Sequence, residues 1–294
     1  MPQASEMLLP QPMQGPAGRR EYDTAQMSGD SAAFRGDIPQ HYDAGLGPVI
    51  FSGYAADIAR RAAELQPSRV LETAAGTGIV TRSLRDALPA TTHLTCTDLQ
   101  APMLEVARRK FRPDERVDFH PADATALPFG DADFELVVCQ FGVMFYPDKD
   151  RAYREVRRVL ARGGHYLFSV WDLHRYNGFA RITHDAIGRF FPDDPPQFMK
   201  IPFSYGFDAI KESLIDAGFT DISATVVQLR RELPDLDLFA RGLVYGSPLI
   251  DQVVARGGVD AEEIRAAIVR DLEREFGNPG IMPIQALVFS AIKG

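Results

Sequence analysis

The sequence predicts an α/β fold in which a mostly parallel β-sheet is covered by helices on both faces. Between residues 69 and 170, short runs rich in β-branched and apolar residues alternate with amphipathic segments, as in consecutive strand–helix–strand units. A glycine-rich turn joins the first of these strands to the next helix, an arrangement found where such sheets bind ligands. The composition agrees, because 45% hydrophobic and 24% charged residues are ordinary values for a globular protein.

Hydrophobic periodicity places seven strands and seven helices along the chain. The predicted strands are residues 69–73, 93–97, 117–120, 134–140, 164–170, 220–231 and 284–292. The predicted helices are residues 53–65, 78–88, 101–112, 151–160, 208–217, 236–256 and 260–276. Crossovers between parallel strands are right-handed, so the loops that follow the strands gather at one edge of the sheet, where ligands bind.

Three stretches depart from this alternation. Residues 1–20 are rich in Pro, Gln, Met and Gly without periodicity, which predicts a disordered tail. Residues 172–206 are rich in aromatic residues and proline, and residues 235–278 are helical between the last two strands. We expect one domain over residues 21–294, with a ligand-binding core at about 66–171 and these two insertions covering the sheet edge.

Charge, cysteine content and hydropathy narrow the function classes. The net charge of −8 disfavours broad contact with nucleic acid, and the basic segments 108–112 and 154–158 are predicted to be solvated helix faces. Cys96 and Cys139 occur in strand-like runs and are expected to be buried thiols, so no disulfide framework or metal site is predicted. No run approaches the ~18 apolar residues of a membrane span, and the first residues lack a secretory pattern. A cytoplasmic location without membrane insertion is therefore expected.

The turn after the first strand reads Glu72-Thr-Ala74-Ala-Gly76-Thr77-Gly78. Small residues at alternate positions allow a sharp turn and a close approach to a ligand, at the N-terminus of the following helix. Nucleoside triphosphates, dinucleotides and S-adenosylmethionine all bind in this way. A triphosphate loop requires Gly-Lys-Ser/Thr, which is absent after Gly78. A dinucleotide fingerprint is weakened because residue 81 is threonine instead of Gly or Ala.

Polar residues follow the next three strands at the same predicted edge. Asp98 ends the second strand, where a carboxylate can accept two hydrogen bonds from a ribose diol. Leu99 and Met103 can offer apolar surface to an adenine ring, although core packing is the simpler interpretation of both. Asp123, followed by Ala124, can bind an adenine edge or cap a turn. Gln140 ends the fourth strand, at the ligand edge.

Five segments together resemble, in order and spacing, the successive motifs of the class I S-adenosylmethionine-dependent methyltransferases of the menaquinone/ubiquinone C-methyltransferase type. They are VLETAAGTG, TDLQAPMLEVAR, ADATALPF, FELVVCQFGVMFYPD and VRRVLARGGHYLFSVWD. The resemblance implies a Rossmann-like seven-stranded sheet, S-adenosylmethionine as cofactor and S-adenosylhomocysteine as product. It implies cofactor-binding roles for Glu72, Ala74, Gly76, Thr77, Gly78, Asp98, Leu99, Met103, Asp123, Ala124 and Gln140. Ala74 departs from the family pattern, which usually has glycine there, so altered cofactor binding is expected.

The acceptor pocket is predicted from position along the chain. Aromatic and apolar residues precede the first strand, follow the fourth and end the fifth: Tyr42, Phe51, Tyr54, Phe141, Met144, Phe145 and Trp171. They indicate a small, apolar or aromatic acceptor, while packing of the cover onto the sheet is the alternative. An enzyme nucleophile is unnecessary because the sulfonium methyl is already electrophilic. His174 is the best-placed candidate for a general base, although a packing role is the simpler one.

Methyl transfer to a small molecule by in-line displacement is therefore the leading hypothesis. A non-catalytic binding protein that retains the fold is an alternative, supported by Ala74. An NAD-dependent oxidoreductase is a second alternative, disfavoured by Thr81 and by the ADATALPF segment. O-, N- and C-methylation are not distinguished by the sequence, which is also compatible with an oligomer.

Overall fold

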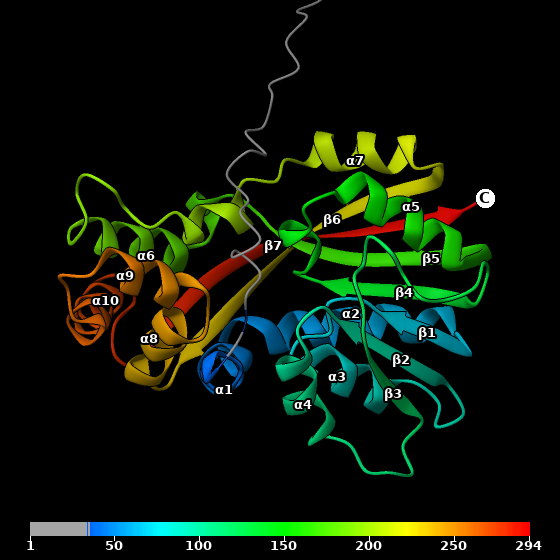
Figure 1. Cartoon of the computed structure of the whole chain (residues 1–294), viewed down its shortest axis with the longest axis horizontal. Coiled ribbons are helices and arrows are strands. Elements are labelled where there is room, and N and C mark those ends of the chain that lie inside the picture. Colours follow the sequence, from blue (N-terminus) through cyan, green and yellow to red (C-terminus); the bar gives the residue numbers. More distant parts are fainter. Residues whose placement is uncertain (1–33, 35) are drawn as a thin grey trace, which may run out of the picture.

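The computed structural model describes residue 34 and residues 36–294, and the predicted tail at 1–20 lies outside these residues. Its centre is one seven-stranded sheet with the strand order β3-β2-β1-β4-β5-β7-β6 (Figure 1). The first five strands run parallel, whereas β7 is antiparallel to both of its neighbours, β5 and β6. The strands are β1 (Arg69–Glu72), β2 (His93–Asp98), β3 (Val117–Pro121), β4 (Phe134–Gln140), β5 (Leu160–Trp171), β6 (Phe219–Leu233) and β7 (Gly280–Lys293). The predicted mostly parallel α/β fold is confirmed.

Helices cover both faces of the sheet because its central strands bury side chains on both sides. One face packs against α2 (Ser52–Leu65), α3 (Ile79–Ala87) and α4 (Ala101–Arg108). The other packs against α5 (Lys149–Val159) and α7 (Phe207–Asp216). Val70 of β1 faces the first layer and Leu71 the second, as the two-residue period of a strand requires.

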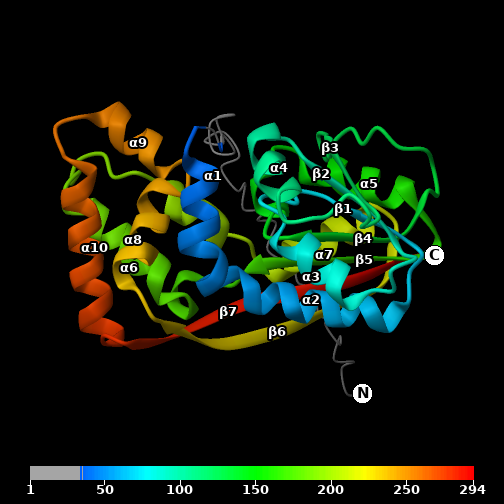
Figure 2. The same cartoon turned by 90° about the horizontal axis from the view of Figure 1, so that it is seen from below.

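The remaining helices gather beyond one end of the sheet, next to the carboxyl end of β5 (Figures 1 and 2). This cover contains α6 (Gly178–Gly188), the 3₁₀ segments η5 (His174–Tyr176) and η6 (Phe198–Phe203), α8 (Leu236–Tyr245), α9 (Leu249–Arg256) and α10 (Ala261–Phe276). A short 3₁₀ turn, η4 (Val143–Phe145), follows β4. The long strands β6 and β7 reach beneath the cover and join it to the sheet.

The helix prediction was wrong at two places that bear on the site. Residues 236–256 form two helices instead of one, because Gly246, Ser247 and Pro248 interrupt the helix. The chain packs closely on Tyr42 at this point, since a Cβ on Gly246 would lie 2.8 Å from the Tyr42 backbone nitrogen. Residues 38–51, for which no helix was predicted, form α1 (Ile38–His41) and the π-helical segment η3 (Tyr42–Phe51). Pro48 and two glycines in η3 hide any helical pattern from sequence analysis.

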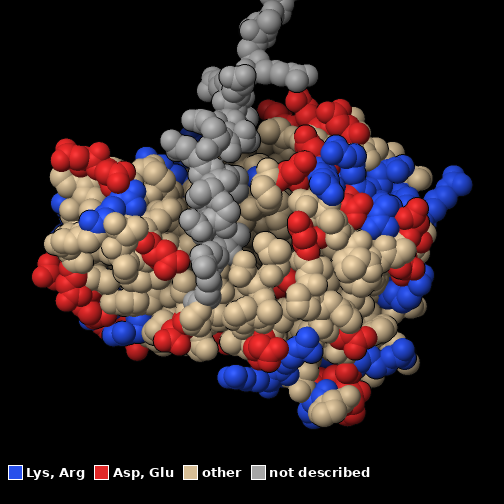
Figure 3. All heavy atoms as spheres, viewed as in Figure 1, with Lys and Arg blue, Asp and Glu red and all other residues tan. Residues whose placement is uncertain are grey.

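Basic and acidic side chains intermingle over the part of the surface near α5 in Figure 3. Arg158 forms ion pairs with Asp131 at 2.9 Å and Glu155 at 2.8 Å, and Arg157 donates a hydrogen bond to the Gly218 carbonyl at 2.9 Å. Among the described residues, no helix is both long enough and apolar enough to cross a membrane.

Candidate functional site

Two adjoining cavities lie at the carboxyl ends of the parallel strands. The first, which we call the outer cleft, has a volume of about 190 Å³ and is lined by residues that follow β1, β2, β3 and β4. The second, the inner pocket, has a volume of about 80 Å³ and lies between the end of β5, η3 and the cover. Four aromatic residues line both cavities: Phe34, Tyr42, Phe141 and Phe145. The two cavities therefore share a wall.

The backbone is left-handed at two non-glycine residues beside the outer cleft. Ala74, just after β1, has a φ of +52°, and Phe141, just after β4, has a φ of +56°. This conformation is costly for residues with a Cβ and concentrates at functional sites. Phe141 is held there by a hydrogen bond from its N–H to the Ser169 carbonyl at 3.0 Å and by stacking on Trp171 at 4.0 Å. A Cβ on Gly142 would lie 2.4 Å from the Ala74 methyl group, so only glycine fits at position 142.

The glycine-rich turn serves two purposes. Gly76, with a φ of +56°, lines the outer cleft, and a Cβ there would meet only Met103 Cε, at 3.5 Å. Gly78, with a φ of +78°, lies outside the cleft and packs so tightly against α4 that a Cβ would lie 2.8 Å from the Ala107 Cβ. Thr77 is also outside the cleft, and its hydroxyl donates to Asp43 at 2.6 Å. Gly78 and Thr77 thus support the turn while Gly76 faces the cavity.

Asp98 lines the outer cleft at the end of β2. Its Oδ2 accepts a hydrogen bond from the Gly76 N–H and its Oδ1 accepts one from the Gln100 N–H, both at 2.8 Å. Burial raises the pKa of this carboxyl above its ordinary value, against the effect of the two N–H donors. Leu99, 59% exposed, and the buried Met103 flank it along the same cavity.

Asp123, Ala124 and Gln140 line the outer cleft as well. Asp123 accepts hydrogen bonds at Oδ1 from the Thr125 N–H and hydroxyl, both at 2.8 Å, and no described residue donates to its Oδ2. The Gln140 side-chain amide donates to the Phe51 carbonyl at 3.3 Å, while its Oε1 is buried without a hydrogen bond from the described part of the chain. Buried polar atoms are normally satisfied, so an unpaired acceptor beside a cavity indicates a ligand-binding position.

Glu72, by contrast, does not line the outer cleft. Only 2% of the residue is exposed, and its Oε2 accepts a hydrogen bond from the Thr81 hydroxyl at 2.6 Å. Burial raises the pKa of this carboxyl to about 8, a change that the hydrogen bonds from Thr81 and Cys96 oppose. Glu72 therefore supports the turn between β1 and α3 from behind.

The inner pocket is aromatic and apolar. Its lining includes five residues named from the sequence, Phe51, Phe141, Met144, Phe145 and Trp171, together with residues of η6 and α8. None of the described residues that line it is charged, and among them Tyr42 and Ser247 supply hydroxyl groups. Tyr54, also predicted there, instead lies fully buried behind it, edge-on to Phe141 and Trp171 and donating a hydrogen bond to the Val227 carbonyl at 3.2 Å.

Several residues that line the cavities were not predicted from the sequence. Tyr146 lines the outer cleft, and its hydroxyl donates a hydrogen bond to Thr73 Oγ1 at 3.2 Å. Leu46 and Ile50 of η3 and Leu243 of α8 line the inner pocket. The aromatic composition of 172–206 did indicate the cover, whereas nothing in the local sequence distinguishes Leu243 from a core residue.

Comparisons with known proteins identify the family of the chain. Residues 70–164 match the family model described as "Methyltransferase domain". The chain is 32% identical over 182 residues to the ubiquinone/menaquinone biosynthesis C-methyltransferase UbiE of Pasteurella multocida, covering 55% of this chain and 68% of that protein. The chain belongs to the class I S-adenosylmethionine-dependent methyltransferases. A demethylmenaquinone methyltransferase of Clavibacter sepedonicus is 38% identical over 105 residues, which are 36% of this chain and 42% of that protein.

Solved structures share the fold of this methyltransferase. A phosphoethanolamine N-methyltransferase of Haemonchus contortus in complex with S-adenosyl-L-methionine aligns over 89% of this chain and 58% of its own, with a TM-score of 0.57 and 18% identity. The YcgJ protein of Bacillus subtilis aligns over 82% and 98%, respectively, with a TM-score of 0.53 and 17% identity. At these identities the likeness concerns the fold alone.

The residues of the outer cleft fit S-adenosylmethionine chemically. Gln140 Oε1 is a buried acceptor without a described partner, and Gly76 leaves its Cβ position open beside the cavity. Carboxylate oxygens of Asp98 and Asp123 line the same cleft and suit a ligand that carries hydroxyl and amino donors. None of the described residues form a cluster of three or more His, Cys, Asp or Glu able to hold a metal ion.

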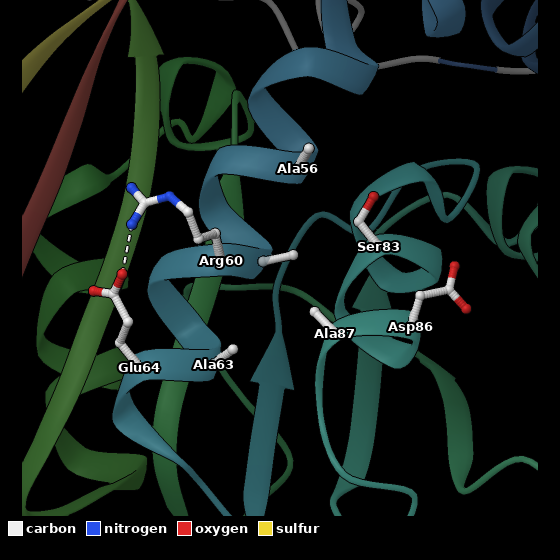
Figure 4. Close-up of a pocket in the computed structure, with 8 residues that line it drawn as sticks. Ala56, Arg60, Ala63, Glu64, Ser83, Asp86 and Ala87 are labelled. Atoms are coloured by element: carbon white, nitrogen blue, oxygen red, sulfur yellow. Dashed lines mark hydrogen bonds and ion pairs between the residues drawn. The ribbon is translucent and has the colours of Figure 1, made fainter.

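The predicted base candidate of this methyltransferase, His174, lines neither cavity. Its Nε2 lies 2.6 Å from the Met199 carbonyl oxygen, and its ring packs on Phe203 with centroids 4.8 Å apart. A third hollow, a separate groove between α2 and α3, is lined by four alanines and four polar residues of the described chain, with the Arg60–Glu64 ion pair at one side (Figure 4).

Replacing Ala74 with glycine should relieve the left-handed strain and raise the free energy of unfolding by about 0.5–1 kcal/mol. The same change should alter the affinity for S-adenosylhomocysteine, because Ala74 lines the outer cleft. Urea titration and calorimetry measure the two effects. The matched control is Ala132→Gly at a second left-handed alanine, with a φ of +62°, which should gain stability without changing affinity. Equal affinity changes in both variants would contradict this role for Ala74.

Replacing Glu72 with glutamine should flatten the dependence of stability on pH in the ligand-free protein. A carboxyl whose pKa rises from 4.5 to about 8 on folding binds more protons in the folded state, so stability falls as pH increases across that window. At pH 8.5 the free energy of unfolding of the variant should exceed that of the wild type by roughly 1–4 kcal/mol, and near pH 4.5 the two values should approach each other. Urea midpoints across this range provide the measurement, with the exposed Glu64→Gln on α2 as control. If the urea midpoints of wild type and Glu72→Gln change in parallel with pH, Glu72 is not a buried carboxyl with a raised pKa.

Proposed function

We propose that this methyltransferase transfers the methyl group of S-adenosylmethionine to a small, uncharged, apolar or aromatic molecule held in the inner pocket. The shared wall between the two cavities supports this proposal. Tyr42, Phe141 and Phe145 line both of them, so a donor in the outer cleft and an acceptor in the inner pocket would meet at these residues.

In this proposal the outer cleft binds the donor. Asp98 holds the ribose hydroxyls, with Leu99 and Met103 on the faces of the adenine ring. Asp123 and the N–H of Ala124 bind the adenine edge, and Ala74 and Gly76 contact the methionine part of the donor. Gln140 lies at the sulfonium end, and all of these residues line the one cavity. Glu72, Thr77 and Gly78 stabilise the turn without lining the cleft.

The protein's contribution to the reaction is positioning. S-adenosylmethionine supplies an electrophilic methyl group that a nucleophile displaces in line with the carbon–sulfur bond. The aromatic walls hold the acceptor and exclude water, and stacking of Phe141 on Trp171 fixes one of those walls. Since no described residue that lines the inner pocket carries a carboxylate, imidazole or amine, the acceptor supplies the nucleophilic atom, and the proton that it releases passes to a base outside this lining.

The Asp98→Ala variant tests the donor cleft. Loss of this carboxylate should weaken S-adenosylhomocysteine binding by about 1–3 kcal/mol, the usual cost of removing a hydrogen-bond partner of a buried polar group. Calorimetric titration of the purified protein gives the affinity directly. Asp118→Asn is a suitable control, because Asp118 is exposed on β3 and pairs with His93. Wild-type affinity in Asp98→Ala would remove this residue from the donor site.

The acceptor class is tested by incubating the protein with isotopically labelled S-adenosylmethionine and panels of small molecules. We expect S-adenosylhomocysteine release with uncharged aromatic or alicyclic compounds. Ring compounds of the quinol type belong in the panel because relatives are named for ubiquinone and menaquinone biosynthesis. Phe141→Ala should lower turnover at least tenfold by removing the shared wall. Turnover with RNA, peptides or highly charged metabolites alone would contradict the proposal.

A further inference from the structure

The segment η3 is a wall of both cavities. Tyr42 lines the outer cleft and the inner pocket, while Leu46, Ile50 and Phe51 line the inner pocket alone. The Tyr42 and Phe51 rings stack with centroids 4.9 Å apart, which joins the two parts of this wall. A π-helical segment of this length is rare, and such geometry is frequent at functional sites.

On the donor side, η3 is held by one carboxylate. Asp43 Oδ1 accepts hydrogen bonds from the Thr77 hydroxyl at 2.6 Å and from the Lys110 ammonium. Thr77 directly follows Gly76, which faces the outer cleft, and Lys110 lies just beyond the end of α4. Asp43 therefore joins η3 to the two elements that flank the donor cleft. Asp43 and Lys110 are each 26% exposed, so their interaction is only partly screened by solvent.

On the acceptor side, η3 packs directly on the cover. A Cβ on Gly45 would lie 2.7 Å from the Gly242 Cα, so η3 and α8 touch through their backbones. Arg231 of β6 donates hydrogen bonds to the carbonyls of Val49 at 2.9 Å and Pro48 at 2.8 Å. A shift of η3 thus changes the shape of the inner pocket, because two closely packed backbones cannot absorb a displacement of one of them.

We propose that Asp43 is a positioning residue: by tying η3 to the donor loop, it makes assembly of the acceptor pocket depend on occupancy of the donor cleft. The inference rests on the proposed function, since it takes the inner pocket as the acceptor site. Donor binding fixes the loop at Gly76 and Thr77, and Thr77 of this loop holds Asp43 in place. The position of Asp43 in turn determines the positions of Tyr42 and Phe51 in η3. Because coupling between two sites is reciprocal, acceptor binding also strengthens donor binding.

Trp171 allows this coupling to be measured without a known acceptor. It is the only tryptophan in the sequence, and it lines the inner pocket but not the outer cleft. We expect S-adenosylhomocysteine to lower the acrylamide quenching constant of Trp171 fluorescence at least twofold in the wild-type protein. In Asp43→Asn this protection should be lost, and S-adenosylhomocysteine should bind about tenfold more weakly, which corresponds to about 1.4 kcal/mol.

Two further variants separate positioning from folding. Lys110→Met removes the second partner of Asp43 without touching either cavity, and should reduce the protection of Trp171 in the same direction. Asp86→Asn removes an aspartate paired with Arg82 on α3 and should behave as wild type. A purely structural role for Asp43 would lower the melting temperature but leave the ligand-induced protection intact, and that result would overturn the proposal.

The outcomes also separate this inference from the proposed function. If the wild-type protein binds S-adenosylhomocysteine but Trp171 is quenched equally with and without it, the coupling is refuted and the donor cleft stands. If calorimetry detects no binding of S-adenosylhomocysteine to the wild-type protein, both the donor cleft and the coupling are refuted.

Discussion

The reversal of strand order between β1 and β4 is the constraint on which the site depends. From β1 the chain proceeds outward to β2 and β3, and then returns to place β4 on the other side of β1. Connections on the two sides therefore leave the sheet in opposite directions, and a crevice opens between the carboxyl ends of these two strands. Ala74 and Phe141 are the residues at which the backbone turns away on each side, both in the left-handed conformation. The strained turns and the cavity are consequences of one topology.

Around this crevice, each half of the site is built from different parts of the chain. The outer cleft is made by loops that follow consecutive strands, so its polar groups are fixed by the rigid sheet. The inner pocket is made where η3, the end of β5 and the cover helices meet, and its lining is apolar. A polar cleft for a shared cofactor and an apolar pocket formed by insertions are what a methyltransferase needs to keep its donor while changing its acceptor.

Position along the chain predicts position in space for residues that directly follow the parallel strands. Asp98, Asp123 and Gln140 each follow a parallel strand, so their presence at one edge could be predicted from strand order, and the structure places all three at the outer cleft. Tyr54 and His174 illustrate the limit. Both are near the pocket in the fold, but helix rotation points the Tyr54 hydroxyl to β6, and η6 covers His174. Such orientations depend on tertiary packing, which periodicity does not contain.

The same limit explains the missed N-terminal segment. The glycines and proline of η3 leave no helical periodicity in the sequence, yet Gly45 is required for backbone contact with Gly242, almost two hundred residues away in the sequence. Contacts of this kind define the inner pocket, and they explain why the cofactor could be inferred from motifs whereas the lining of this pocket could be predicted only in part.

In the proposed donor site, the crevice between β1 and β4 holds the adenosyl group with its sulfur directed toward the inner pocket. A crystal structure of the protein grown with S-adenosylhomocysteine would show this arrangement. We expect the ribose at Asp98, the adenine at Asp123 and Ala124, and the sulfur beside Gln140 and Phe141. Density for the ligand elsewhere, or a crevice closed by the protein's own side chains at saturating ligand, would contradict it.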